Sequence, residues 1–162
     1  MKYTNESVRR QDRLLNEETA RSILKQGEYG VLSMQTENCG AYGIPISYAW
    51  DEKHSIYAHC AHEGRKLRCI DLCNKVSFCV VGKTTVLPSK FSTEYESIVL
   101  CCSAHRGLPA DERMKALMLL LEKYSPNDME KGKKYAENSV EKTEIIRLDI
   151  IEWSGKSRTV KG

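Results

Sequence analysis

Apolar and polar positions repeat with a helical period near the start of the chain and with a period of two further on. Between Asn16 and Gly27 the apolar residues that share one helix face are Ala20, Ile23 and Leu24. Asn16 is a typical N-cap, the two acidic residues after it suit the positive end of the helix dipole, and Gly27 is a typical stop. The pattern therefore predicts an amphipathic helix between Asn16 and Gly27.

Three stretches with a period of two follow that helix, over residues 29–34, 41–50 and 55–60. Polar turns, such as the one at 37–40, join them, and these connections are too short for parallel crossovers. We therefore expect a three-stranded antiparallel meander. Pro45 lies inside the second stretch and donates no amide hydrogen. This predicts an edge or bulge position, where a ligand can approach the backbone.

The remaining elements complete the same plan. In chain order the pattern predicts a short helix over 63–74, a buried strand over 75–81, a loop or short strand over 84–91 and a longer strand over 93–104. Two helices follow, from Pro109 onward and over 127–139, and then a last strand over 143–153. The helix after Pro109 carries an apolar stripe, interpreted as core packing, at Met114, Leu117, Met118 and Leu121.

There is no β-α-β alternation and no internal repeat in this order of elements. It predicts an α+β fold in which an antiparallel sheet closes into a barrel with flanking helices. A chain of 162 residues is long enough for one hydrophobic core and too short for two, so we expect a single domain over residues 1–162.

Charge and composition limit the partners. The chain is 41% hydrophobic and 29% charged, as in an ordinary soluble globular protein. Its net charge of +3 comes partly from basic ends, at Arg9, Arg10, Arg13, Lys156, Arg158 and Lys161. So small an excess is weak support for nucleic-acid binding. Neither a membrane span nor the apolar segment of a signal peptide is present, so we expect a cytoplasmic protein with no membrane or nucleic-acid partner.

The seven cysteines are then expected in a reducing compartment, where disulfides rarely persist. The clusters that invite a metal or redox interpretation are Cys60, Cys69 and Cys73, and the pair Cys101–Cys102. Neither cluster has the paired C-x-x-C pattern of a zinc site, so we expect structural thiols and no metal. Cys79 lies in an apolar strand and is expected to be a small buried residue.

One stretch carries the features of an anion site. The strand that contains His59 runs through Gly64 into a helix whose first turn holds Arg65 and Lys66. Free amides and the dipole at a helix start favour an anion, and two adjacent cations strengthen that preference for phosphate. The rest of such a ligand would lie over His59 and the backbone near Pro45. A surface helix with two solvated cations explains these residues equally well, so both interpretations remain open at this point.

The order of several segments resembles the pyridoxamine-phosphate-oxidase-like flavoprotein superfamily, and within it the Nim-type nitroimidazole-resistance proteins. The segments that carry this resemblance are 29–33, 42–48 and 57–67, followed by 76–82, 95–97 and 154–156. The resemblance covers about residues 9–158, which we take as the ordered core between basic termini. It implies an FMN-binding split β-barrel that forms a homodimer with FMN at the subunit interface.

The resemblance also implies roles for individual residues. It places the FMN contacts at Pro45, Ile46, Ser47, Tyr48, His59, Cys60, Arg65, Lys66 and Ser97. Lys66, assisted by Arg65, would bind the phosphate, and Ser97 would reach the phosphate or ribityl chain. The backbone of 45–48 would line the isoalloxazine. His59 would be the catalytic residue, acting by proton donation or by stabilising an anion.

The chain departs from the family pattern in two places. Cys101–Cys102–Ser103 stands where the family usually has a Phe–Gly pair, and the end of the chain lacks the Arg-rich clamp that binds pyridoxamine phosphate.

From the resemblance we expect an FMN-dependent reductase that passes electrons from a reduced nicotinamide or another donor to a small oxidised acceptor such as a nitroaromatic. The alternatives are a flavin-binding sensor or storage protein without turnover, and a haem- or deazaflavin-using enzyme on the same barrel.

Overall fold

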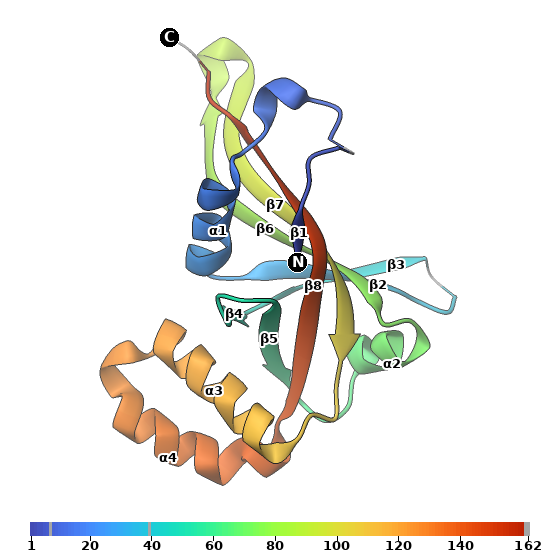
Figure 1. The fold of residues 1–162 in the computed structure, drawn as a ribbon, viewed down its shortest axis with the longest axis vertical. Helices are drawn as coiled ribbons and strands as arrows, with labels where there is room; N and C mark the ends of the chain where they lie inside the picture. The colour runs from blue at the N-terminus through green and yellow to red at the C-terminus, as the bar shows by residue number, and fades with distance from the viewer. Residues whose placement is uncertain (7, 39, 161–162) are drawn as a thin grey trace.

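The computed structural model describes residues 1–6, 8–38 and 40–160, and its central feature is a curved eight-stranded sheet (Figure 1). The strands are β1 Lys2–Tyr3, β2 Gly30–Gln35, β3 Ala41–Ile46, β4 Ala49–Trp50, β5 Ser55–Cys60, β6 Lys75–Leu87, β7 Ser92–His105 and β8 Glu144–Arg158. The helices in this part of the chain are α1 Glu17–Gln26, α2 Arg65–Leu72, α3 Ala110–Tyr124 and α4 Met129–Ser139, with short 3-10 turns between some elements.

The sheet order shows how the barrel closes. The strands follow the path β3-β2-β6-β7-β8-β5-β4, with antiparallel neighbours throughout, and β1 pairs in parallel with β8. The two ends of this path, β3 and β4, are separated in the chain by Ser47 and Tyr48 alone. The sheet must therefore curl until its two ends lie near each other, although β3 and β4 do not pair in the described structure. The predicted α+β fold with an antiparallel barrel is confirmed.

The meander predicted from the sequence is wrong in one respect. The stretch 41–50 is two strands, of which β3 pairs with β2 while β4 pairs with β5. Tyr48 lies at the break: its side chain is fully buried, and its hydroxyl donates to the Leu24 carbonyl oxygen at 2.6 Å. Burial of this tyrosine directs the chain from one end of the sheet to the other. Pro45 lies in the edge strand β3, opposite Val31, as predicted.

The first helix has the predicted ends. The Asn16 side chain accepts a hydrogen bond from the Thr19 amide at 2.8 Å, and the Gly27 amide donates to the Ile23 carbonyl oxygen at 2.9 Å. The predicted inward face, with Leu24 at its centre, is buried. A Cβ on Gly27 would lie 2.5 Å from Val80 Cγ1, so glycine is needed there for close contact between α1 and β6. The predicted turn 37–40 is closed by the Thr36 amide on the Gly40 carbonyl oxygen, and Cys39 within it lies outside the described residues.

The strands β6, β7 and β8 are longer than predicted. β6 continues past an irregularity between Val81 and Thr84 to Leu87, so the first half of the stretch 84–91, predicted as a loop or short strand, belongs to this long strand, and Pro88–Lys90 form a 3-10 turn. β8 continues to Arg158, which pairs with Tyr95 of β7, where a basic tail was expected. β7 pairs with β6 along one edge and with β8 along the other. This pairing gives hydrogen-bond partners to backbone groups in stretches that the sequence pattern left outside the strands. Figure 1 shows these strands extending together beyond α1.

Only one face of β6 packs against the core. Phe78 and Val80 are fully buried, whereas Cys79 between them is half-buried on the opposite face. The prediction that Cys79 is a buried residue is therefore wrong, because the strand alternates rather than being covered on both sides.

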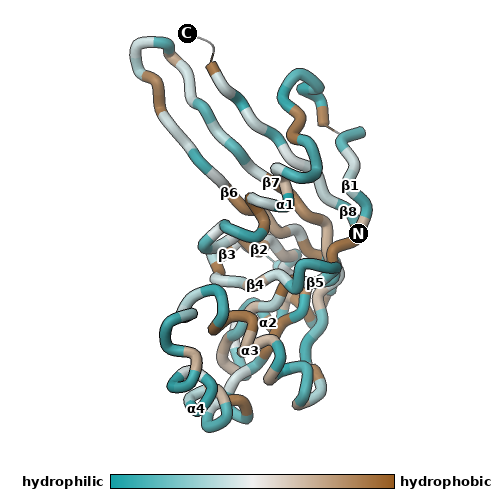
Figure 2. The backbone as a smooth tube through the Cα atoms, turned by 60° about the vertical axis from the view of Figure 1, so that its left-hand side comes forward, coloured by the Kyte–Doolittle hydropathy of each residue, from teal (hydrophilic) through white to brown (hydrophobic). Residues whose placement is uncertain are grey.

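The helices α3 and α4 form an antiparallel hairpin at the end of the barrel opposite the long strands (Figure 1). The residues of the predicted apolar stripe on α3 are only partly buried. The buried residues of this helix are instead Ala116 and Leu120. Figure 2 shows that α4 is mostly hydrophilic, which fits a helix that contacts the barrel through its partner α3. A Cβ on Gly132 of α4 would lie 2.6 Å from Leu121 Cδ2, so this glycine lets the two helices approach closely. None of the described helices is long and apolar enough to span a membrane.

Candidate functional site

An open cavity of about 490 Å³ lies where the ends of β3 and β5 meet the start of α2 and the segment before β8. The residues predicted from the sequence that line it are Pro45, Ile46, His59, Cys60 and Lys66. The other residues that line it are Ile44, Ala61, Lys142 and Thr143. The fold therefore brings most of the predicted contact positions into one cavity.

The end of β5 positions His59 and Cys60. β4 pairs with β5 at Tyr57 and Ile56, whereas His59 pairs with Ile145 of β8. The strand is thus held by β8 at His59 while its other edge faces the cavity. The His59 side chain is exposed and Cys60 is half-buried. A side chain at the end of a paired strand is held in place by the sheet and is still accessible to a ligand.

The start of α2 positions Lys66. Gly64 has φ +152°, in the region that favours glycine, and it turns the chain into the helix. The amides of Leu67 and Arg68 make the first bonds, both to the Gly64 carbonyl oxygen, so the amides before them are available to an anion. Leu67 is buried and fixes the helix against the barrel. Lys66, one position earlier, lines the cavity.

The charge in this cavity is positive. Lys66 and Lys142 are the charged residues among those that line it in the described structure, and no carboxylate is among them. Arg65 is not part of the lining: its guanidinium carbon lies 4.2 Å from the centre of the Tyr42 ring on β3. The two cations predicted as a pair therefore have separate positions.

Cys60 contributes a neutral wall. Burial raises the pKa of its thiol, and the nearby Lys66 opposes that rise without cancelling it. The group is therefore a thiol rather than a thiolate at neutral pH.

The structure does not bring every predicted contact into this cavity. Ser47 lines an adjoining cavity together with His59. The Tyr48 side chain packs in the core, edge-on to Phe78, and burial raises the pKa of its hydroxyl. Ser97 lies in β7, paired with Val81 and Lys156, and is not among the residues that line the cavity.

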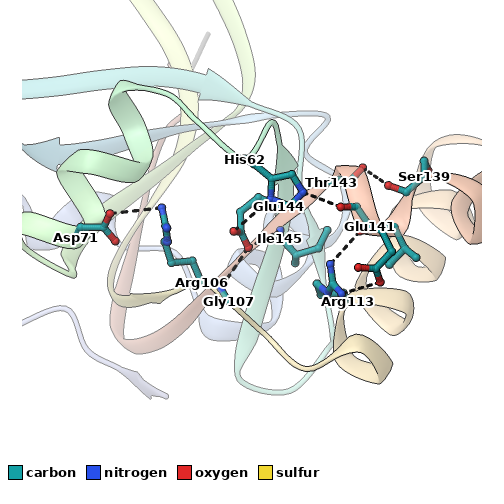
Figure 3. A network of polar contacts seen from close by, with 11 residues as sticks. His62, Asp71, Arg106, Gly107, Arg113, Ser139, Glu141, Thr143, Glu144 and Ile145 are labelled. Carbon is teal, nitrogen blue, oxygen red and sulfur yellow. Dashed lines mark hydrogen bonds and ion pairs between the residues drawn. The ribbon is translucent and has the colours of Figure 1, made fainter.

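A polar network holds the segment that carries Lys142 (Figure 3). The buried Glu144 carboxylate accepts hydrogen bonds from the amides of Gly107 and Ile145, each at 3.2 Å. His62 Nδ1 lies 3.8 Å from the same carboxylate, and its Nε2 lies 2.9 Å from the Glu141 carbonyl oxygen. The network joins the segments after β5, before α3 and before β8.

The sequence interpretation missed Lys142 and Thr143. They come directly before β8, and Cys60 pairs with Glu144, which brings them beside the end of β5. Pairing between the predicted strands 55–60 and 143–153 would have revealed this, but the local pattern contains no information on strand partners that lie so far apart in the chain.

The described cysteines are free thiols. In the part of the chain that the structure describes, no group of three or more His, Cys, Asp or Glu side chains is arranged to hold a metal ion.

Comparison with known proteins identifies the family and the fold of the chain. The sequence profile of the family described as pyridoxamine 5'-phosphate oxidase matches residues 16–157. A candidate 5-nitroimidazole antibiotic resistance protein from Bacteroides thetaiotaomicron has 16% identity and a TM-score of 0.76, over 90% of this chain and 86% of that one. A conserved hypothetical protein from Mycobacterium tuberculosis has 14% identity and a TM-score of 0.77, over 94% and 96%.

A third solved structure, an FAD- and haem-binding protein from Mycobacterium smegmatis, has 18% identity and a TM-score of 0.70, over 90% of this chain and 72% of that one. At these identities the structural likenesses show the fold alone. No curated protein matches the sequence. The family profile, however, spans most of the chain: the chain belongs to the pyridoxamine 5'-phosphate oxidase family, and its fold is the flavin-binding split barrel.

Proposed function

We propose that the chain is an FMN-dependent reductase, active as a homodimer, that passes electrons from a reduced nicotinamide or another donor to a small oxidised acceptor such as a nitroaromatic. The observation that carries the proposal is the cavity that combines Lys66 and Lys142 with the exposed His59 and has no carboxylate in its described lining.

The residues present fit FMN. A phosphate monoester carries about −1.5 to −2 charges at neutral pH, and two lysines beside the start of α2 match that charge. Pro45 and its neighbours belong to β3, which forms one end of the sheet, so the free edge of this strand offers backbone groups to a flat ring. Cys60 adds an uncharged wall. In this assignment Lys66 holds the phosphate, and Ile46 and His59 lie beside the isoalloxazine.

The outer face of the long strands supports a dimer. Val81, Val99 and Ile151 are exposed on β6, β7 and β8, at 56%, 44% and 57%. Exposed apolar groups on neighbouring strands are typical of a surface covered by another chain. Ser97 is two positions from Val99 and shares its face of β7. We therefore assign Ser97 to the flavin site of the partner subunit.

The chemistry divides between cofactor and protein. A bound flavin supplies two-electron transfer. Reduction of a nitro group to a nitroso group consumes two electrons and two protons and releases one water molecule. His59, which lines the cavity, is placed to supply one proton by general acid catalysis, and solvent supplies the other.

Anaerobic spectroscopy tests this function. The FMN-loaded protein should lose its flavin absorbance on addition of NADH or NADPH and regain it on addition of a nitroaromatic, with His59→Ala slowing the second step. His59→Ala should retain FMN, which separates a catalytic defect from loss of the cofactor. A sensor or storage protein would be favoured instead if the bound FMN is not reduced by NADH or NADPH and, after reduction by dithionite, is not reoxidised by a nitroaromatic.

A second cofactor assignment comes from the solved structures, which include a flavocytochrome from Azotobacter vinelandii and the FAD- and haem-binding protein. The absorbance of the purified protein and the mass of the released cofactor distinguish FMN from FAD, haem and a deazaflavin.

A further inference from the structure

A second cavity, of about 320 Å³, lies between the α3–α4 hairpin and the strand ends of the first cavity. Its apolar wall includes Leu117, Leu120 and Leu121 of α3 and Ala136 of α4. Tyrosine and hydroxyl side chains complete the lining together with His59, and no Asp, Glu, Lys or Arg belongs to it in the described structure. The cavity is therefore suited to an uncharged ligand.

The two cavities adjoin. His59 and Thr143 line both of them, and Ser47, next to the Pro45–Ile46 wall of the first cavity, lines the second. A ligand in the second cavity would therefore contact the same imidazole as a flavin in the first. The hairpin thus forms one side of a continuous site.

The hairpin is anchored at both ends of α3. Near its end the Tyr124 hydroxyl accepts from the Tyr48 amide at 2.9 Å and lies 2.5 Å from the Glu28 carbonyl oxygen. Near its start Arg113 donates to the Val140 carbonyl oxygen at 3.0 Å and to the Glu141 carboxylate at 2.9 Å. The first contacts tie α3 to the chain between β3 and β4, and the second tie it to the 3-10 turn Val140–Lys142 that leads into β8. The cavity is therefore a built feature between anchored elements.

Size and polarity define the ligand. An apolar cavity of about 150 Å³ holds benzene, so about 320 Å³ accommodates one substituted aromatic ring. An ionised group would enter without a partner among the described lining residues, at a high desolvation cost. We propose that this cavity binds the ring of an uncharged aromatic acceptor and directs its reducible substituent toward His59 and the flavin. The inference rests on the proposed function.

Ligand binding can be measured without turnover. Nitrobenzene and 4-nitrobenzoate have the same ring, and only the second is charged. Saturation-transfer NMR on the FMN-loaded protein should show binding of nitrobenzene that is at least about tenfold tighter than that of 4-nitrobenzoate. Equal affinities, or tighter binding of 4-nitrobenzoate, would overturn the assignment to uncharged ligands.

Filling the cavity tests the location. Ala136 is 3% exposed and lines the cavity, so Ala136→Phe should weaken nitrobenzene binding at least about tenfold. The matched control is Asn138→Phe, an exposed position on the same helix that does not line the cavity, which should change binding less than about twofold. Leu121→Phe is a milder second filling variant in case Ala136→Phe does not fold. Unchanged nitrobenzene affinity in a folded filling variant would overturn the proposal.

FMN affinity separates this inference from the proposed function. The filling variants should bind FMN within about threefold of the original protein. Loss of FMN together with nitrobenzene would overturn the inference, because the second cavity would then hold the flavin itself. If the original protein takes up no FMN, the proposed function fails, while nitrobenzene binding and its loss in Ala136→Phe remain measurable on the cofactor-free protein.

Discussion

The guanidinium carbon of Arg65 lies 4.2 Å from the centre of the Tyr42 ring, whereas its neighbour Lys66 lines the cavity at the end of β5. These two adjacent cations at the start of α2 therefore have different contacts. Arg65 ties α2 to the edge strand β3, and Lys66 is available to a ligand.

A double-mutant cycle between Arg65 and Tyr42 measures the first role. Arg65→Ala and Tyr42→Leu should couple by about 0.5–1 kcal/mol in the free energy of unfolding, the usual strength of an exposed cation–π pair. Urea unfolding of both single variants and the double variant gives this coupling. Arg65→Ala should also leave FMN affinity within about threefold. Additive effects of the two substitutions would show that the pair contributes nothing.

Lys123 gives the protein a pH-dependent stability. Burial lowers the pKa of its ammonium group to about 8, although the Gly27 carbonyl oxygen accepts its hydrogen bond at 2.7 Å. Between about pH 8 and its ordinary pKa of 10.5 the unfolded chain binds more protons than the folded one, so this group makes stability rise with pH across that window. The rise should be about 1 kcal/mol after allowance for solvent screening.

Lys123→Met removes that contribution. Denaturant unfolding at several pH values from 7 to 10.5 should show a smaller increase in stability for the variant than for the original protein. The difference between the two curves isolates this lysine from tyrosines and cysteines that titrate in the same range. Parallel curves would contradict the lowered pKa.

Gly27 is required by contact rather than by backbone conformation. A Cβ there would lie 2.5 Å from Val80 Cγ1 and 2.9 Å from the Tyr48 hydroxyl oxygen. Gly27→Ala should therefore cost about 1–3 kcal/mol of unfolding free energy, the usual range for overpacking. Gly43→Ala is the control, because its Cβ would meet its nearest atoms at 3.5 Å, an ordinary contact. Equal stability of the two variants would show that α1 moves away at little cost.

Glu144 holds the segment before β8 through two backbone amides. Glu144→Ala would leave the Gly107 and Ile145 amides without their acceptor, at a cost of about 2–3 kcal/mol. Glu144→Gln keeps an acceptor oxygen and should cost less than about 1 kcal/mol. Glu141→Gln serves as a surface control with an effect below about 0.5 kcal/mol, since its side chain is 75% exposed. Thermal unfolding of the three variants checks this order.

The sequence predicted those features that depend on neighbouring residues. The caps of α1, the edge position of Pro45 and the place of Lys66 in the first turn of a helix all follow from local pattern. The resemblance to the family added the assignment to a flavin site. The Nim-like fold and the family are confirmed, whereas the role of each contact residue stays a prediction.

Features that depend on distant pairing were missed. The break at Tyr48 follows from burial of its ring between α1 and the barrel, and the length of β8 follows from its pairing with β7. Lys142 enters the site through the pairing of Cys60 with Glu144. The role proposed for Ser97 requires a second copy of the chain. Local periodicity does not predict these features, because the partner of each strand depends on packing and pairing across the whole sheet.

The assignment of Lys66 to a flavin phosphate is tested by titration of purified protein with FMN, followed by flavin fluorescence, for the original chain, Lys66→Ala and Lys53→Ala. The original chain should bind one FMN per subunit. Lys66→Ala should weaken binding about 10- to 100-fold, since a hydrogen bond to a charged group contributes about 1.5–3 kcal/mol. Lys53, exposed and outside the cavity, should have an effect below about twofold when replaced. An original chain that takes up no FMN, or a Lys66→Ala variant that binds it unchanged, would contradict the assignment of this cavity to FMN.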